Sequence, residues 1–215
     1  MFLDLSTEEE LNKYSLRPSN DIFLFSNVFS EDMCNKLIDY TNKNAKDRLE
    51  VGYAQNVQAY EKVLVENDTF FKHISSKIVD IGKFINKKYN IPFGNYNNYK
   101  YGNNPIGLEK IRMRKIYGPT KIHTDSPLSA LPVPCSCCHA GDKMISVTGV
   151  RGVSIIIALN GDYDGGEIVF PCQNFKTKLK QGEAILFPPY WTHPHYTEDL
   201  KNNTFRYTIN TWLTV

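Results

Sequence analysis

The chain has 215 residues, of which 41% are hydrophobic and 13% aromatic, enough to bury the core of one sizeable domain. Its formal net charge of +2, with 22% charged residues, lacks the strong basic excess of a typical nucleic-acid-binding or membrane-surface protein. The first ten residues are acidic where a targeting signal would be basic, and no apolar run is long enough to span a bilayer. We therefore expect a cytoplasmic protein that binds neither nucleic acid nor a membrane.

Two helices are predicted in the first half of the chain. Ser30 is a good N-cap, and the carboxylates of Glu31 and Asp32 suit the first turn of a helix that runs to about Asn44. The second helix is predicted to be capped by Asp68. It carries apolar residues at three- and four-residue steps, a stripe typical of a core-facing side: Phe71, Ile74, Ile78, Ile81 and Ile85.

From Glu109 onward, short apolar runs are separated by glycine, proline and asparagine, which predicts strands and turns. The predicted strands are 109–117, 153–159, 167–170, 175–178, 184–187 and 204–215, with a shorter one at 22–25. The basic residues of the first of these, among them Arg112 and Arg114, are interpreted as its solvated side. Many short strands favour a sandwich or jelly roll. We expect one α+β domain over residues 1–215, with helical support and loops over 1–108 and a β core over 109–215.

The sharpest local feature is the sequence His123-Thr124-Asp125. In an extended segment, residues i and i+2 point to the same side, so His123 and Asp125 can supply two adjacent ligands to a divalent transition metal. His193 and His195 share a parity near the C-terminus, and either can complete a two-histidine, one-carboxylate triad. Such a triad leaves three positions open on iron(II) for a cosubstrate and dioxygen, whereas structural zinc has four protein ligands.

A guanidinium group further along the chain suits a site of this kind. Arg206 lies 11 residues after His195 and 13 after His193, so a hairpin-sized connection can return it to the metal. Its planar fork matches a carboxylate in bidentate fashion. A surface ion pair is the other interpretation of this arginine taken alone.

These motifs follow one another in a recognisable order. After the His-x-Asp sequence come Gly165-Gly166-Glu167, Phe187-Pro188-Pro189, a histidine, then Arg206-Tyr207 and finally Trp212. On this set of motifs the sequence resembles the prolyl 4-hydroxylase branch of the 2-oxoglutarate- and iron(II)-dependent dioxygenases. The resemblance runs from about Ile111 to Leu213 and extends to the stretch 29–34.

The resemblance implies a double-stranded β-helix (jelly-roll) core with N-terminal supporting helices. It implies that His123, Asp125 and one later histidine are the catalytic iron ligands, and that Arg206 binds the distal carboxylate of 2-oxoglutarate. Three further residues match family positions, two at the cosubstrate and one lining the substrate pocket: Tyr117, Thr208 and Trp212 respectively.

The resemblance leaves two candidates for the third iron ligand. Counting forward from the Phe-Pro turn selects His193, and counting back from Arg206 selects His195. We favour His195, because its spacing to Arg206 is nearer that of the family, and keep His193 as the alternative.

The implied activity is hydroxylation of a C–H bond, most simply the conversion of a prolyl residue in a peptide or protein to 4-hydroxyproline. The implied cofactors are Fe(II), 2-oxoglutarate as cosubstrate, O2, and ascorbate as reductant. Another side chain or a free amino acid is an alternative substrate. The rival functions are a non-catalytic jelly-roll module that holds a metal and a zinc hydrolase, and Arg206 argues against the hydrolase because hydrolysis needs no carboxylate clamp.

Two features depart from the family pattern. Ala158 stands where several relatives carry a cosubstrate-binding tyrosine, so Tyr117 or another group must assist Arg206. An insertion at residues 128–150 contains the cluster Cys135-Ser136-Cys137-Cys138-His139. We interpret it as a loop that covers the substrate, because the spacings are too cramped for a usual zinc loop.

Overall fold

The computed structural model describes residues 7–19, 21–49, 58–89, 100–101, 104–105, 108–125 and 151–214. The predicted substrate-covering insertion at 128–150 therefore lies outside the described residues. Of the helices in the described ranges, none combines the length and apolar character needed to cross a membrane.

The described residues contain three α-helices, α1 (Glu8–Tyr14), α2 (Glu31–Asn44) and α3 (Phe71–Tyr89). Helix α2 has the predicted bounds, because the Ser30 side chain accepts a hydrogen bond from the backbone N–H of Met33. The four isoleucines of the predicted α3 stripe are completely buried. Helix α1 is an addition to the predicted elements and begins with a capping box between Thr7 and Glu10.

The predicted cap of α3 is wrong. Asp68 lies before the helix, and its carboxylate accepts hydrogen bonds from the backbone N–H of Val65 and from the Tyr40 hydroxyl. The backbone carbonyl of Asp68, not its side chain, accepts a hydrogen bond from the N–H of Phe71. The carboxylate therefore ties the turn before α3 to helix α2.

Eight strands of the described chain form one large antiparallel sheet, in the order β1-β2-β13-β9-β16-β7-β4-β3. Their bounds are β1 Ser15–Ser19, β2 Ile22–Phe25, β3 Lys46–Leu49, β4 Gln58–Val63, β7 Arg112–Tyr117, β9 Arg151–Ala158, β13 Ala184–Phe187 and β16 Arg206–Thr214. The N-terminal part of the chain supplies both edges of this sheet, so it contributes strands as well as the predicted helices and loops.

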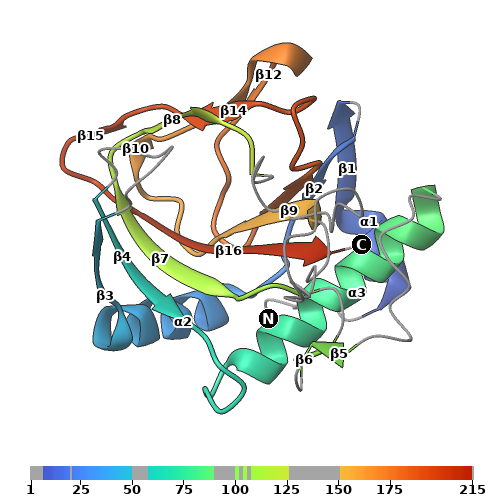
Figure 1. Ribbon diagram of the computed structural model, residues 1–215, viewed down its shortest axis with the longest axis horizontal. Helices are drawn as coiled ribbons and strands as arrows, with labels where there is room; N and C mark the ends of the chain where they lie inside the picture. Colours follow the sequence, from blue (N-terminus) through green and yellow to red (C-terminus); the bar gives the residue numbers. More distant parts are fainter. Residues whose placement is uncertain are drawn as a thin grey trace, which may run out of the picture.

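Four shorter strands form a second sheet in the order β12-β11-β14-β8. They are β8 Thr120–His123, β11 Ile168–Phe170, β12 Phe175–Thr177, which follows the 3-10 turn Pro171–Gln173, and β14 His195–Thr197. The short ribbons β5 (Lys100–Tyr101) with β6 (Asn104–Pro105) and β10 (Asp164–Gly165) with β15 (Leu200–Lys201) complete the described strands. In Figure 1, α2 and α3 lie on one side of the large sheet and the small sheet on the other. This is the predicted jelly roll with supporting helices.

Alternation along β9 separates the two faces of the large sheet. Val153, Ile155 and Ile157 belong to the hydrophobic cluster that includes the α3 isoleucines. Ile156 and Ala158 belong to a second cluster, on the face towards the small sheet. We call the first the helix face and the second the inner face of the large sheet. The inner face is where the polar residues predicted for the site are found.

The basic residues of β7 are not a solvated side, so this prediction is wrong. Arg112 and Arg114 both form ion pairs with the buried carboxylate of Glu61 on β4, at 3.1 and 2.7 Å. Cross-strand pairing places Arg114 opposite Glu61 and Thr208, on the inner face. The pattern was misinterpreted because the partner carboxylate is distant in the sequence.

Candidate functional site

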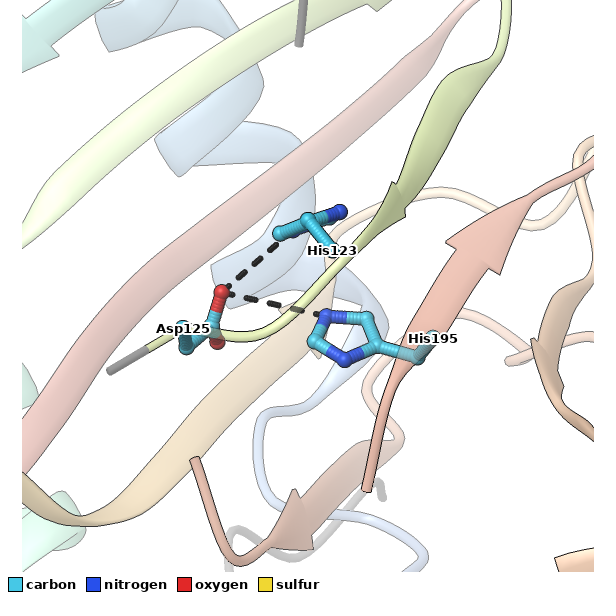
Figure 2. Close-up of side chains that lie close together, drawn as sticks. All are labelled: His123, Asp125 and His195. Atoms are coloured by element: carbon cyan, nitrogen blue, oxygen red, sulfur yellow. Dashed lines mark ion pairs between the residues drawn. The ribbon is translucent and has the colours of Figure 1, made fainter. Parts of the chain in front are cut away.

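The small sheet brings two imidazoles together directly across a strand pair. His195, the first residue of β14, lies opposite His123, the last residue of β8, and their ring centroids are 4.4 Å apart. Asp125 follows β8 by two residues and turns its carboxylate towards both rings (Figure 2). One ligand atom from each of these three residues lies within 4.8 Å of the others.

Backbone carbonyls orient both rings. The Nδ1–H of His123 donates to the carbonyl of Lys121 at 2.7 Å, and the Nδ1–H of His195 donates to the carbonyl of His193 at 3.1 Å. Since a carbonyl only accepts, Nδ1 carries the proton in each ring, and Nε2 is the nitrogen that could bind a metal. The two Nε2 atoms lie 3.4 Å and 3.8 Å from Oδ1 of Asp125.

The protonation states suit metal binding. Burial raises the pKa of the Asp125 carboxyl, but its interactions with His123 and His195 outweigh burial, and the net pKa lies well below its ordinary value. Burial lowers the pKa of His195 despite the nearby carboxylate. A neutral imidazole and an ionised carboxylate are the forms that bind a metal. This donor set fits a divalent transition metal such as iron(II).

The alternative third ligand has a different position. His193 is buried, its Nδ1 lies 3.0 Å from the Thr192 hydroxyl, and its ring packs edge-on to Phe170 at 6.4 Å. Its carbonyl orients His195, as described above. The geometry therefore groups His195, not His193, with His123 and Asp125.

Arg206 is buried on the inner face of the large sheet, next to strand β14. Its side chain is only 5% exposed, and it donates from Nη1 to the carbonyl of Gly166 at 3.1 Å and from Nη2 to the Thr197 hydroxyl at 3.2 Å. Its buried Nε has no hydrogen-bond partner, and no carboxylate of the described residues pairs with the guanidinium. Burial lowers the pKa of Arg206. Among the described residues, this buried cation therefore has no anionic partner.

The predicted Gly-Gly-Glu turn serves this arginine. Gly166 has φ +69°, and a Cβ there would lie 2.7 Å from Cδ2 of Leu200 and 3.2 Å from Cδ of Arg206. Only glycine meets both demands without strain, because it tolerates positive φ and needs no space for a side chain. The turn consequently places a carbonyl acceptor against the guanidinium.

The two predicted cosubstrate residues lie on opposite faces of the large sheet. Thr208 is buried on the inner face two residues from Arg206, and its hydroxyl donates to Oδ1 of Asn210 at 2.6 Å. Tyr117 instead packs its ring against Phe205 at 5.6 Å, on the helix face. The reason is strand parity: Ile116, not Tyr117, lies opposite Arg206. The structure does not bring Tyr117 to the site.

Trp212 lines the site next to Asp125. Its indole N–H donates to Oδ2 of Asp125 at 3.1 Å, and the guanidinium of Arg151 lies over the indole ring. Sequence reasoning missed Arg151 and Thr197, since an arginine at a strand start and a threonine in a strand carry no local signal. The Gly165-Gly166 turn was noticed only as a motif, without its contact to Arg206.

Comparison with known proteins supports the predicted resemblance. A putative prolyl 4-hydroxylase of Acanthamoeba polyphaga mimivirus is 23% identical over 177 residues, which are 80% of this chain. The match spans 62% of that protein, so this chain corresponds to less than two thirds of its curated relative. No family model matches the chain.

Three solved structures that share the fold are prolyl hydroxylases. The viral collagen prolyl hydroxylase of Paramecium bursaria Chlorella virus-1, in its 2-oxoglutarate complex, has a TM-score of 0.60 at 19% identity, covering 91% of this chain and 96% of that one. A Pseudomonas putida prolyl-4-hydroxylase has a TM-score of 0.58 at 12% identity, covering 96% of each chain. The Trichoplax adhaerens prolyl hydroxylase bound to a hypoxia inducible factor peptide has a TM-score of 0.60 at 16% identity, covering 96% of this chain and 86% of that one. The predicted fold and the resemblance to prolyl 4-hydroxylases are thus confirmed.

Proposed function

We propose that this chain is an iron(II)- and 2-oxoglutarate-dependent dioxygenase that converts peptidyl proline to 4-hydroxyproline, with ascorbate keeping the iron reduced. The observation that carries the proposal is the buried guanidinium of Arg206, which pairs with no carboxylate of the described residues and lies close to the cluster of His123, Asp125 and His195. Neither a structural metal site nor a hydrolase has a use for such a cation.

The spacing of the two groups fits a dicarboxylate. Arg206 donates to Thr197, which lies two residues beyond His195 on β14. Two residues of an extended strand span about 7 Å, a distance that a five-carbon dicarboxylic acid can bridge. The keto-acid end would then lie at the metal and the distal carboxylate at Arg206, with the Thr208 hydroxyl on the same face.

The chain's own residues would hold and shield the reacting groups. His123, Asp125 and His195 would hold Fe(II) on one side and leave the other positions open. When bound, iron(II) supplies the oxygen chemistry that couples decarboxylation of 2-oxoglutarate to succinate with hydroxylation of a C–H bond. Phe187 and Phe170 pack against His195, with ring centroids 4.6 and 5.4 Å away, and exclude water from that side.

A proline-containing peptide is the substrate that the relatives favour. Two of the similar structures are named for collagen and for a complex with a hypoxia inducible factor peptide, which are different peptide substrates. In this chain Trp191 is 82% exposed and lies four residues before His195. Its ring offers a surface on which a proline ring can stack. Trp191→Ala should therefore raise the KM for peptide roughly threefold to tenfold with little change in stability.

Turnover and product analysis test the proposal. Purified protein with Fe(II), ascorbate and air should form succinate from 2-oxoglutarate and 4-hydroxyproline in proline-containing peptides. His123→Ala and His195→Ala should lose at least about 100-fold in turnover. His193→Gln is the matched control, since the backbone carbonyl that orients His195 is kept, and it should retain most activity.

Each other outcome points elsewhere. Succinate formation without peptide hydroxylation would support a free amino acid or another side chain as the substrate. Loss of activity in His193→Gln with retention in His195→Ala would reverse the ligand assignment. Protein that binds neither Fe(II) nor 2-oxoglutarate would contradict the proposal.

A further inference from the structure

All three guanidinium nitrogens of Arg151 donate hydrogen bonds next to the candidate metal site. It is the first residue of β9, and its Nε and Nη2 donate to the two carboxylate oxygens of Glu109 at 2.7 and 2.9 Å. The remaining nitrogen, Nη1, donates to the backbone carbonyl of Asp125. This bidentate pair fixes the plane of the guanidinium and joins it to Asp125 at the same time.

The same guanidinium stacks on Trp212. Its central carbon lies 3.7 Å from the centroid of the indole, close enough for a strong cation–π contact. The indole N–H in turn donates to Oδ2 of Asp125 at 3.1 Å. Arg151 therefore reaches Asp125 by two routes, directly at the backbone and through Trp212 at the side chain.

Asp125 needs such support because of its place in the chain. It follows β8 by two residues, so the hydrogen bonds of the strand ladder do not fix it. Its two carboxylate oxygens have separate partners: Oδ2 is held by Trp212, while Oδ1 faces the Nε2 atoms of His123 and His195. The backbone and one oxygen are held so that the other oxygen points at the metal position.

We propose that Arg151, clamped by Glu109 and stacked on Trp212, is a positioning residue that sets the orientation of Asp125 towards the metal. The inference rests on the proposed function for its metal, although the contacts themselves do not depend on it. Loss of a supporting group of this kind typically costs 10- to 100-fold in metal affinity. The stacked, bidentate geometry requires arginine, because lysine keeps the charge but has neither the planar fork nor the flat face.

A neighbouring arginine provides a matched control. Arg112 also lies over the Trp212 ring, at 5.8 Å, is half-buried like Arg151, and forms its ion pair with Glu61. Replacing either arginine by lysine therefore disturbs one partly buried ion pair on the same sheet. Only the Arg151 replacement removes the hydrogen bond to Asp125.

The test measures metal affinity and ligand geometry directly. Co(II) binding to the purified full chain would be titrated by its visible d–d absorption, which reports coordination geometry, for wild type, Arg151→Lys, Trp212→Phe and Arg112→Lys. We expect Arg151→Lys and Trp212→Phe to weaken Co(II) binding 10- to 100-fold and to change the spectrum of the saturated protein. Arg112→Lys should stay within about twofold of wild type with an unchanged spectrum. Urea unfolding of the metal-free proteins shows how much each variant loses in stability alone.

The outcomes separate this inference from the proposed function. Wild-type affinity and spectrum in both Arg151→Lys and Trp212→Phe would overturn the positioning role, whatever the catalytic activity. Equal losses in Arg151→Lys and Arg112→Lys would overturn it as well, because Arg112 contacts Trp212 but not Asp125, so the loss would not depend on the hydrogen bond from Arg151 to Asp125. A third outcome is that Arg151→Lys and Trp212→Phe differ from wild type in Co(II) binding as expected, but the wild-type protein hydroxylates no peptide. This outcome would support the positioning role and contradict the proposed function.

Discussion

The two faces of strand β16 have opposite characters. Towards the helices, Ile209 and Leu213 are completely buried in the large hydrophobic cluster, and the Tyr207 hydroxyl donates to Asn42 of α2 at 2.7 Å. Towards the small sheet, Arg206 is also buried, but its Nε has no hydrogen-bond partner among the described residues. The helix face is apolar and closely packed, while the inner face holds a buried charge that no carboxylate of the described residues neutralises.

The difference shows how one sheet serves two purposes. A fully packed apolar face supplies the stability that a strained or unsatisfied site consumes. Burying the Arg206 guanidinium without a carboxylate partner costs free energy as long as no ligand is bound. A ligand carboxylate recovers that cost when it binds. The following predictions alter one face at a time, from the largest expected effect to the smallest.

The largest effect is expected on the inner face from Arg206→Met. Removing the guanidinium should weaken 2-oxoglutarate binding roughly 100-fold or more, because a buried charge-assisted pair is lost. The metal-free protein should lose little stability: two hydrogen bonds to Gly166 and Thr197 are lost, but a buried charge with no carboxylate partner among the described residues is removed as well. Fluorescence titration with 2-oxoglutarate in the presence of Co(II), together with urea unfolding, measures both quantities. A variant that is strongly destabilised and still binds 2-oxoglutarate would reverse the contrast between the faces.

On the helix face, Ile78→Ala is expected to have the opposite effect, a loss of stability without a loss of binding. This side chain is completely buried in the cluster against β9 and β16, so its truncation should lower the free energy of unfolding by about 2–5 kcal/mol. Below its melting transition the variant should bind Co(II) within about twofold of wild type, because the cluster and the metal site share no side chain. A loss of Co(II) affinity comparable to that of a ligand variant would mean that the two faces are coupled.

A smaller effect is expected at the turn that supports Arg206. Gly166→Ala should cost about 1–2 kcal/mol from positive φ and should also weaken 2-oxoglutarate binding several-fold, because the new methyl group presses on Arg206. Gly118→Ala is the matched control: it has φ +81°, but the nearest atom to a Cβ is 3.9 Å away. Equal binding in the two variants would show that strain, and not contact with Arg206, explains the glycine.

The smallest effect is expected at the polar link between the helices. Burial and the hydrogen bond to Asp68 raise the pKa of Tyr40 to about 12, and Tyr40→Phe should cost about 1 kcal/mol. The folded state favours the neutral phenol, so this contribution is complete below about pH 10 and is lost as pH rises towards 12. Urea midpoints of wild type and Tyr40→Phe should therefore converge at high pH. A gap that persists through pH 12 would contradict the role of the hydroxyl.

Sequence patterns located the elements whose signal is local. The isoleucine spacing predicted α3 and the cap at Ser30 predicted α2, because a helix face and a cap depend on residues one or two turns apart. Strands β4 and β14 were not predicted, and β8 was expected only as an extended segment around His123-Thr124-Asp125. Their three to six residues are mostly polar, and only pairing with distant strands makes them strands.

The same distinction applies to the site. The i, i+2 parity of His123 and Asp125 and the spacing of Arg206 from the histidines could be predicted, since each depends on a few consecutive residues or on a family pattern. The prediction placed Tyr117 at the cosubstrate. Successive residues of a strand face opposite sides, and Ile116 lies opposite Arg206, so the next residue, Tyr117, faces the helices. Arg151 could not be found, because its contacts to Glu109 and Trp212 cross the sheet.

The position of β8 has a consequence for how the protein would lose its metal. In the described sheet β8 is an edge strand whose one neighbour is β14, and the candidate ligands lie on these two strands and just beyond β8. An ion bound there would act as a cross-link between an edge strand and the body of the sheet, so its binding free energy would also oppose local opening. Amide protons of β8 should thus exchange with solvent faster once the ion is removed by a chelator, while those of β9 stay protected. Metal loss and fraying of this edge would be one event.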